Sequence, residues 1–417
     1  MRQSGEIRAK SNTILLLNCT SMTHMDEQPR EKIPVALVRC PGYEEEEAEQ
    51  GVRQATDLIG GIGSFLSPGM HVLVKPNLLM GAPPERAVCT HPTILEAVCR
   101  LLTTHGCTVT IADSPGAGIP YRTRNLLRAY DQSGYTPLAG IPGVTLNQDT
   151  SSRTTPFSGG RLVRQFEIIS PVLDADAVVV VSKLKTHIFT GMTGAVKNLF
   201  GTIPGLDKPP FHARLQDESR FGEMLLDLNR CIRPVLQIMD AIDIMEGDGP
   251  MAGRTVRLGA ILASPDPVAL DSIACRLIGI EPLSIGSIRA ASDQGLFREE
   301  EVEIRGEDPG TLAMPGVEKP KTRREKQQSL ARRMIQGVLR RLGQSYTLHP
   351  TLKKSACTRC HQCERTCPVG AISLKNGYPR FDYATCICCY CCHEMCDSHA
   401  IGLSPGILHR ALRPLIR

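Results

Sequence analysis

The 417-residue sequence lacks any run of the roughly 18–20 apolar residues that a transmembrane helix needs, so no membrane-spanning segment is expected. The apolar stretch at residues 14–17 is too short for the core of a signal peptide. Without a sign of export, the 17 cysteines indicate a reducing, cytoplasmic location rather than a disulfide framework. Residues 1–32 are predicted to be an unstructured extension, in which Met22 and Met25 are alternative translation starts.

The sequence also lacks the two common nucleotide-binding loops. Its glycine-rich segment at residues 60–63 follows a predicted helix instead of a strand, and no G-x-x-x-x-G-K-S/T loop occurs. A nicotinamide cofactor or ATP in a standard pocket is therefore not expected. The formal net charge is only +5 and much of it lies in residues 318–342, so the sequence gives no general case for a nucleic-acid partner.

Two cysteine runs near the C-terminus share one spacing. Cys357, Cys360, Cys363 and Cys367 form a C-x2-C-x2-C-x3-C run, and Cys386, Cys389, Cys392 and Cys396 repeat it 29 residues further along (357 to 386). This is the ligand pattern of a bacterial two-cluster ferredoxin, in which eight thiolates hold two [4Fe–4S] clusters. The sequence therefore predicts two [4Fe–4S] clusters in a small ferredoxin-like α+β domain at residues 355–405.

In this pattern the fourth cysteine of each run binds the cluster held by the other run. The predicted ligand sets are Cys357, Cys360, Cys363 and Cys396 for one cluster, and Cys386, Cys389, Cys392 and Cys367 for the other. Between the runs, Asn376-Gly377 predicts a hairpin turn. A four-cysteine zinc site usually shows two pairs with a longer spacer, so zinc is the weaker alternative.

The second run departs from the ferredoxin pattern in two ways. Asp397 stands where a proline is expected, and Cys388 and Cys391 are additional thiols. These two thiols could be alternative ligands, a redox-active pair or packing residues. Only the frame that starts at Cys386 gives a complete quartet.

Residues 33–307 alternate short β-like runs with helical patterns, which indicates a large, doubly wound α/β domain with a mainly parallel sheet. The predicted strands cover residues 34–39, 71–76, 108–112, 177–182, 235–241 and 258–263. The predicted helices cover residues 44–59, 93–105, 218–231 and 267–278. Ligands of such sheets bind beyond the carboxyl ends of the strands, so the polar residues after each strand are candidates for a site.

Lysines and other polar residues follow several of these strands in the sequence. The candidates are Lys75 and Asn77, then Asp113 and Ser114, and then Lys183, Lys185, His187, Thr190, Lys197 and Asn198. Interleaved glycines and threonines suit an anion-binding loop, in which lysines would neutralise a carboxylate or phosphate. We assign His187 as the acid or base, Lys183 and Lys197 as its catalytic partners, and the rest as substrate-binding residues. The alternative is that the lysines are solvated and Asn198 caps a helix.

Residues 308–354 form a basic linker without this alternation. Apolar residues recur there at helical spacing between arginines, from Leu330 to Leu342, which predicts an amphipathic helix that packs on one of the domains. A membrane-surface or acidic-partner contact is the alternative. Residues 406–417 form a basic tail on which an acidic redox partner could dock.

Several of these segments resemble a known family. Residues 75–77, 183–187, 193–201 and 245–250, with Asp266 and Asp271, resemble the family called domain of unknown function 362, across residues 33–304. The C-terminal module is similar to a ferredoxin-type module that is commonly fused to that domain. The resemblance implies a distinct α/β catalytic or ligand-binding unit, and it implies no substrate.

These features predict an iron–sulfur redox protein that passes electrons through two [4Fe–4S] clusters to an anionic substrate or cofactor on the α/β domain. Such a protein would be a ferredoxin-linked oxidoreductase with a ferredoxin, a flavodoxin or a reductase as its redox partner. The alternative is a non-catalytic electron carrier or maturation factor whose α/β domain binds a partner protein. Clusters with only a structural role are a third interpretation.

If both cysteine runs hold clusters, the anaerobically purified chain contains about eight iron and about eight sulfide ions per molecule. Iron and acid-labile sulfide analysis against protein concentration measures both numbers. About four iron atoms or fewer, or zinc in their place, would contradict the two-cluster prediction.

Overall fold

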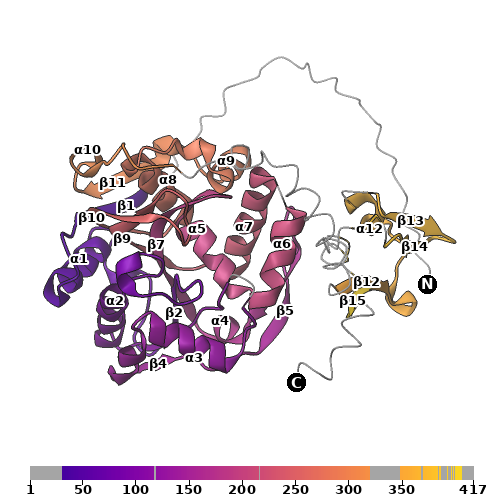
Figure 1. The fold of residues 1–417 in the computed structure, drawn as a ribbon, viewed down its shortest axis with the longest axis horizontal. Helices are drawn as coiled ribbons and strands as arrows, with labels where there is room; N and C mark the ends of the chain where they lie inside the picture. The colour runs from indigo at the N-terminus through magenta and orange to yellow at the C-terminus, as the bar shows by residue number, and fades with distance from the viewer. Residues whose placement is uncertain are drawn as a thin grey trace, which may run out of the picture. The chain divides into compact units, whose positions relative to one another are not determined.

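The computed structural model describes residues 31–116, 119–215, 217–319, 348–367, 370–383, 385–386, 392, 396, 398 and 400–405. Up to residue 319 its strands are β1 (Ile33–Arg39), β2 (His71–Pro76), β3 (Thr108–Ile111), β4 (Val144–Leu146), β5 (Ser152–Pro156), β6 (Gln165–Ile169), β7 (Ala177–His187), β8 (Gly191–Thr193), β9 (Leu236–Glu246), β10 (Arg254–Ser264) and β11 (Val302–Gly306). Figure 1 shows the main sheet with helices packed against it.

Helices alternate with these strands. They are α1 (Glu45–Asp57), α2 (Pro92–Thr104), α3 (Thr123–Gln132), α4 (Ser170–Asp174), α5 (Ala195–Asn198), α6 (Lys208–Arg214), α7 (Glu218–Ile232), α8 (Pro267–Leu277), α9 (Gly286–Asp293) and α10 (Pro309–Leu312). Asp266 caps α8 by accepting hydrogen bonds from the backbone N–H groups of Val268 and Ala269. Proline occupies the first position of that helix, where its missing N–H group leaves no bond unmade.

Among the described residues, the main sheet has nine strands in the order β11-β1-β10-β9-β7-β2-β3-β4, with β8 paired to β7. Within it only β10 and β8 run antiparallel to their neighbours. The predicted mainly parallel sheet is therefore confirmed, and all six predicted strands are present. The strand predicted at residues 177–182 is longer than expected. Residues beyond Ser182 pair with β8 and β9, so β7 continues to His187.

The sheet is buried on both faces, as in other doubly wound folds. In β7, Val178 and Val180 join the apolar core that α5, α7, α8 and α9 also form. Val179 and Val181 join a second core, with α1, α2 and α3. The alternating side chains of one strand thus enter two cores, which explains the uninterrupted valine run.

The strand order reverses between β2 and β7. The chain moves from β2 to β3 and β4 on one side, and from β7 to β9 on the other. In such sheets this reversal point leaves a crevice at the carboxyl ends of the two strands. Lys75 lies at that end of β2 and Lys183–His187 at that end of β7.

The C-terminal part, described by itself, contains β12 (Leu348–Leu352), α12 (Gln362–Thr366), β13 (Ile372–Lys375), β14 (Tyr378–Phe381) and β15 (Ile401–Pro405). Strands β13 and β14 form an antiparallel hairpin, which confirms the predicted turn. Asn376 and Gly377 both have positive φ, 54° and 76°, as a two-residue type I′ turn requires.

Several predictions concern residues outside the described ranges. They are the extension at residues 1–30, the linker helix between residues 320 and 347, the tail at residues 406–417, and the roles of Cys388, Cys389, Cys391 and Asp397.

The core predicts a clear stability difference between two leucines. Leu73 in β2 is fully buried, and the Leu73→Ala substitution should lower the free energy of unfolding by about 2–5 kcal/mol because it leaves a cavity. Leu127 in α3 is 41% exposed, and Leu127→Ala should change it by less than about 0.5 kcal/mol. Urea denaturation followed by circular dichroism measures both values, and equal effects would contradict the burial of β2.

Candidate anion-binding site

A buried ion pair joins the ends of β2 and β3. Lys75 is fully buried, and its Nζ donates hydrogen bonds to Asp113 Oδ2 and to the Pro76 carbonyl oxygen, both at 2.8 Å. Asp113 Oδ2 also accepts a bond from the Leu78 N–H at 3.0 Å. Gly201 lies against this pair, because a Cβ there would approach Asp113 Oδ1 to 2.2 Å. The close approach therefore requires glycine at position 201.

Two amide side chains extend this network to a second buried lysine. Lys185 Nζ donates to Asn77 Oδ1 at 2.8 Å and to the Val88 carbonyl oxygen. The Asn77 amide donates to Asn198 Oδ1 at 3.1 Å, and Asn198 Nδ2 donates to the Lys75 carbonyl at 3.2 Å. Asn198 in α5 is thus bonded to the end of β2, whereas the alternative interpretation made it a helix cap. Lys75 and Lys185 are both buried, so these lysines are not a solvated surface.

A cavity of about 570 Å³ opens at this point, and we call it the switch-point cavity. Of the predicted site residues, Asn77, Asp113, Ser114, His187, Lys197 and Asn198 line it. The structure thus brings together residues that are more than 100 positions apart in the sequence. Their convergence follows from the meeting of β2, β3 and β7 at one edge of the sheet.

Lys208 also lines the cavity, and the sequence analysis did not select it. Its Nζ donates to the carbonyl oxygens of Ser114 and Pro115, so it fixes the loop after β3. A compositional pattern could have identified it. Between residues 33 and 318 the sequence contains only five lysines, namely Lys75, Lys183, Lys185, Lys197 and Lys208. All five lie at the ends of β2 and β7 or around the cavity, while arginines supply the other cations of this region.

Three of these lysines have no carboxylate partner among the described residues: Lys185, Lys197 and Lys208. Burial lowers the pKa of Lys185 and of Lys208 from 10.5 to about 7. Burial and the nearby charges of Lys208 and Lys75 lower the pKa of Lys197 to about 8. Lys197 and Lys208 line the cavity and Lys185 bonds its lining residue Asn77, so a bound anion would stabilise the ammonium groups in and beside the cavity.

His187 lies at the cavity in a defined orientation. Its Nδ1 accepts hydrogen bonds from the N–H groups of Phe189 and Thr190, at 3.1 and 3.2 Å. Burial, followed by the charges of Lys197 and Lys185, holds the pKa of His187 well below 6.5. The ring is therefore neutral near pH 7, with its proton on Nε2, and it is a hydrogen-bond donor more than a general base.

Two buried polar atoms in the cavity wall have no hydrogen-bond partner among the described residues. They are Asp113 Oδ1 and Ser114 Oγ, on side chains that are 2% and 1% exposed. A buried acceptor without a donor is costly, so these atoms mark a place where a ligand or water supplies one.

Four predicted residues do not line the cavity. Lys75 and Lys185 lie beside it and bond the lining residues Asp113 and Asn77, whereas Lys183 and Thr190 have partners elsewhere. Lys183 Nζ is 2.8 Å from Asp240 Oδ2 and 2.9 Å from the Tyr43 hydroxyl, and it does not line the cavity. Its partner is set by register, because Lys183 on β7 lies opposite Asp240 on β9. Thr190 donates its hydroxyl to the Met192 carbonyl at 2.9 Å and is likewise absent from the cavity lining.

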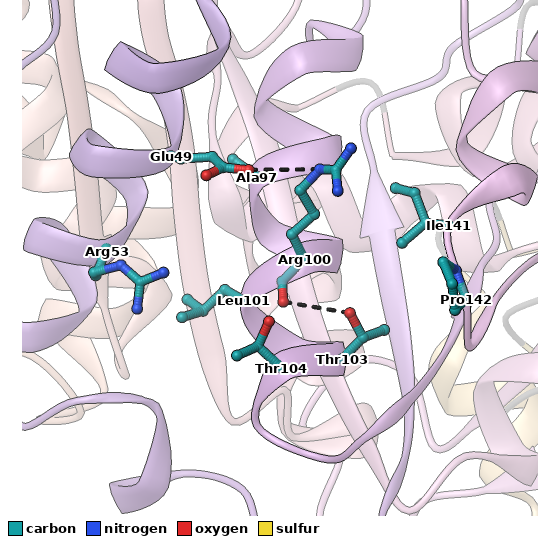
Figure 2. Close-up of a pocket in the computed structure, with 9 residues that line it drawn as sticks. All are labelled: Glu49, Arg53, Ala97, Arg100, Leu101, Thr103, Thr104, Ile141 and Pro142. Carbon is teal, nitrogen blue, oxygen red and sulfur yellow. Dashed lines mark hydrogen bonds and ion pairs between the residues drawn. The ribbon is translucent and has the colours of Figure 1, made fainter.

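A second hollow, of about 440 Å³, lies between α1 and α2 (Figure 2). Its Arg100 bonds Glu96 and lies 3.5 Å from Glu49, and the arginine side chain is 44% exposed. These charges neutralise one another in solvent, so they offer little to a ligand. The switch-point cavity is the better candidate because Lys208 is buried, Lys197 is partly buried, and neither has a carboxylate partner among the described residues.

In the C-terminal part, four predicted cluster ligands line one small cavity: Cys357, Cys360, Cys363 and Cys396. Among the described residues, no three His, Cys, Asp or Glu side chains meet closely enough to hold a single metal ion. The sulfur atoms of Cys367 and Cys396 accept hydrogen bonds from the N–H groups of Ala371 and Ala400, each at 3.2 Å. The two runs therefore repeat a local N–H···S geometry as well as a spacing.

Comparison with known proteins identifies the family. The chain is 34% identical over 269 residues to thylakoid-associated protein sll1697 of Synechocystis sp., a match that covers 63% of this chain and 79% of that protein. The family model of domain of unknown function 362 matches residues 72–276. The chain belongs to the domain of unknown function 362 family. A model of the 4Fe-4S binding domain matches residues 350–373, so this family member also carries an iron–sulfur binding domain.

Two solved structures match part of this chain at low identity and low TM-score. The lactate racemase apoprotein from Thermoanaerobacterium thermosaccharolyticum is 11% identical with a TM-score of 0.38, and the match covers 62% of this chain and 59% of that one. A Thermotoga maritima protein is 12% identical with a TM-score of 0.33, over 50% of this chain and 53% of that one. The chain thus spans less than two thirds of either structure. No helix among the described residues is long and apolar enough to cross a membrane.

The lowered lysine pKa values predict how stability depends on pH. Between about pH 7 and pH 10 the unfolded chain binds more protons than the folded one, so the stability of the ligand-free protein should rise with pH. Sulfate, which stays a dianion, should raise the melting temperature most at about pH 7 and little at about pH 9, because an anion favours the charged lysines. Differential scanning fluorimetry of the full chain measures both trends. In Lys197→Met the sulfate effect should shrink, and an unchanged effect would contradict the site.

Proposed function

We propose that this chain is an iron–sulfur redox protein in which two [4Fe–4S] clusters pass electrons to an anionic ligand bound in the switch-point cavity. The observation that carries the proposal is the unbalanced positive charge at the reversal point of the sheet, on the buried Lys185 and Lys208 and on the partly buried Lys197. Burying such charge is costly without a counter-ion, which supports a dedicated anion site.

The ligand assignment of the clusters is part of this proposal. The cavity shared by Cys357, Cys360, Cys363 and Cys396 supports crossed ligation, because Cys396 comes from the second run. The repeated N–H···S bonds at Cys367 and Cys396 support a second, equivalent cluster held by Cys367, Cys386, Cys389 and Cys392. When bound, the clusters would supply single electrons, which a ferredoxin, flavodoxin or reductase would deliver.

The cavity residues have distinct parts in this proposal. Lys197 faces no other partner among the described residues, so all three of its N–H donors are available to the anion. His187 donates its Nε2 proton as a hydrogen bond, and its low pKa argues against a general base at this position. The ammonium group of Lys197, with a pKa of about 8, is the better proton source for a ligand that gains electrons.

The roles assigned from the sequence change accordingly. Lys75 and Lys185 support the floor of the cavity, and Lys208 holds the loop after β3. Lys183 stabilises the junction of β7 and β9 through Asp240, so we no longer propose that it is catalytic. The free thiols of the α/β part, among them Cys40, Cys99 and Cys275, support a reducing compartment such as the cytoplasm.

Removing Lys197 should weaken anion binding without loss of the clusters. Calorimetric titration of phosphate into the anaerobic full chain should show a dissociation constant about 10- to 100-fold larger for Lys197→Ala, because a charge-assisted hydrogen bond is lost. Iron content and the visible absorbance of the clusters should stay unchanged. Lys32→Ala is the matched control, since Lys32 is exposed and bonds only the Glu300 carbonyl in the described structure.

Two outcomes would contradict the proposal separately. If Lys197→Ala, Lys32→Ala and the unchanged chain bind phosphate with the same affinity, the proposed anion site is contradicted. If dithionite cannot reduce the clusters, the proposed electron transfer is contradicted, and the clusters have only a structural role.

A further inference from the structure

We propose that the switch-point cavity takes a planar ring compound that carries a dianionic group, such as a phosphate monoester or a dicarboxylate. This inference rests on the proposed anion site and adds the class of ligand. It is drawn from the charge balance of the cavity and from the composition of its walls.

The charge balance favours a head group with more than one negative charge. Lys75 is paired with Asp113, and Lys183 with Asp240, but Lys185, Lys197 and Lys208 have no carboxylate partner among the described residues. When all three are protonated, a monoanion would leave two positive charges uncompensated, whereas a dianion would leave one. A dianion bound beside Lys197 and Lys208 leaves a smaller imbalance, which Lys185 shares through Asn77.

Most of the cavity wall is apolar, so the ligand needs an apolar body. The wall includes Leu79, Phe189, Phe200, Pro209, Pro250 and Met251. A volume of about 570 Å³ lies within the ordinary range for small-molecule sites and exceeds what an inorganic anion fills. The lysines thus bind the anionic group of the ligand, and the remaining space suits a body of one or two rings.

His212 provides a flat surface for such a ring. It lies in the cavity wall, and its own ring stacks on Phe221 with centroids 4.7 Å apart and planes 16° apart. Phe189 and Phe200 meet His212 edge-on, at 5.5 and 5.4 Å. Although the residue is exposed, desolvation of its ring by the packed neighbours and then the nearby Lys197 lower the pKa of His212 to about 4, so the ring is neutral at pH 7 and stacks as an aromatic group. Planar ligands fit a cluster of this kind better than branched aliphatic ones do.

The test separates the ring from the anion. Methyl phosphate, phenyl phosphate, 1-naphthyl phosphate and phenol are titrated into the anaerobic full chain by calorimetry. Phenyl phosphate should bind about 10-fold more tightly than methyl phosphate, with 1-naphthyl phosphate tighter again, because ring burial and stacking add to the anion contact. Phenol should bind far more weakly than phenyl phosphate.

Variants assign the preference to this cavity. His212→Ala should remove most of the difference between phenyl and methyl phosphate and leave methyl phosphate affinity unchanged, whereas His212→Phe should keep the difference. Lys197→Ala should weaken all three phosphates together. His105→Ala is a control for the loss of a histidine ring, because His105 bonds the Leu66 carbonyl outside the cavity.

The outcomes distinguish the proposed anion site from the further inference that the ligand carries a ring. Equal affinities for methyl and phenyl phosphate would overturn the ring inference and leave the anion site in place. Failure of every phosphate to bind would overturn both. A ring preference that persists in His212→Ala would place the ring at another wall and overturn the role of His212.

Discussion

The ion pair between Lys75 and Asp113 holds the candidate site together. It joins the ends of β2 and β3, accepts the N–H of Leu78, and lies against Gly201 where a side chain would not fit. The loop after β3 is tied to the same place, because Ser114 donates its N–H to the Gly201 carbonyl at 2.9 Å. Loss of one partner would leave a buried charge uncompensated, which typically costs about 3–5 kcal/mol. The walls of the cavity therefore depend on this pair.

Around that pair the fold carries the electrostatic cost of buried lysines, which the proposed anion site would explain. Lysine suits this use better than arginine, because an ammonium group can lose its proton when it is buried, whereas a guanidinium group keeps its charge. In the absence of an anion, Lys185, Lys197 and Lys208 can thus release protons. Binding of the proposed anion would reverse that release, so ligand binding would be linked to proton uptake at this edge of the sheet.

The sequence predicted the parts of the fold that depend on local pattern. The valine run of β7, the cap and proline that start α8, and the Asn376-Gly377 turn are each specified within a few residues, and each is present. The partners of a side chain on a neighbouring strand could not be predicted, because the register between the two strands determines which residues lie opposite each other. Lys183 pairs with Asp240 on β9 and does not line the cavity, whereas Asp113 pairs with Lys75 and does line it. His187 was expected to titrate near neutral pH, but burial beside two lysines removes that property. Lys208 went unnoticed because its importance comes from the loop it contacts, not from a motif.

The different locations of lysine and arginine in this protein make its lysines useful spectroscopic probes. Of the 13 lysines in the chain, five fall between residues 33 and 318, and all five belong to the ends of β2 and β7 or to the cavity. Lysine carrying ¹³C at Cε, incorporated during growth, labels these side chains although most of them are buried, and it leaves arginine unlabelled. The labelled resonances of residues 33–318 would therefore report on the ends of β2 and β7 and on the cavity. A ligand, a proton or a change of redox state at the reversal point of the sheet could be observed there without any engineered probe.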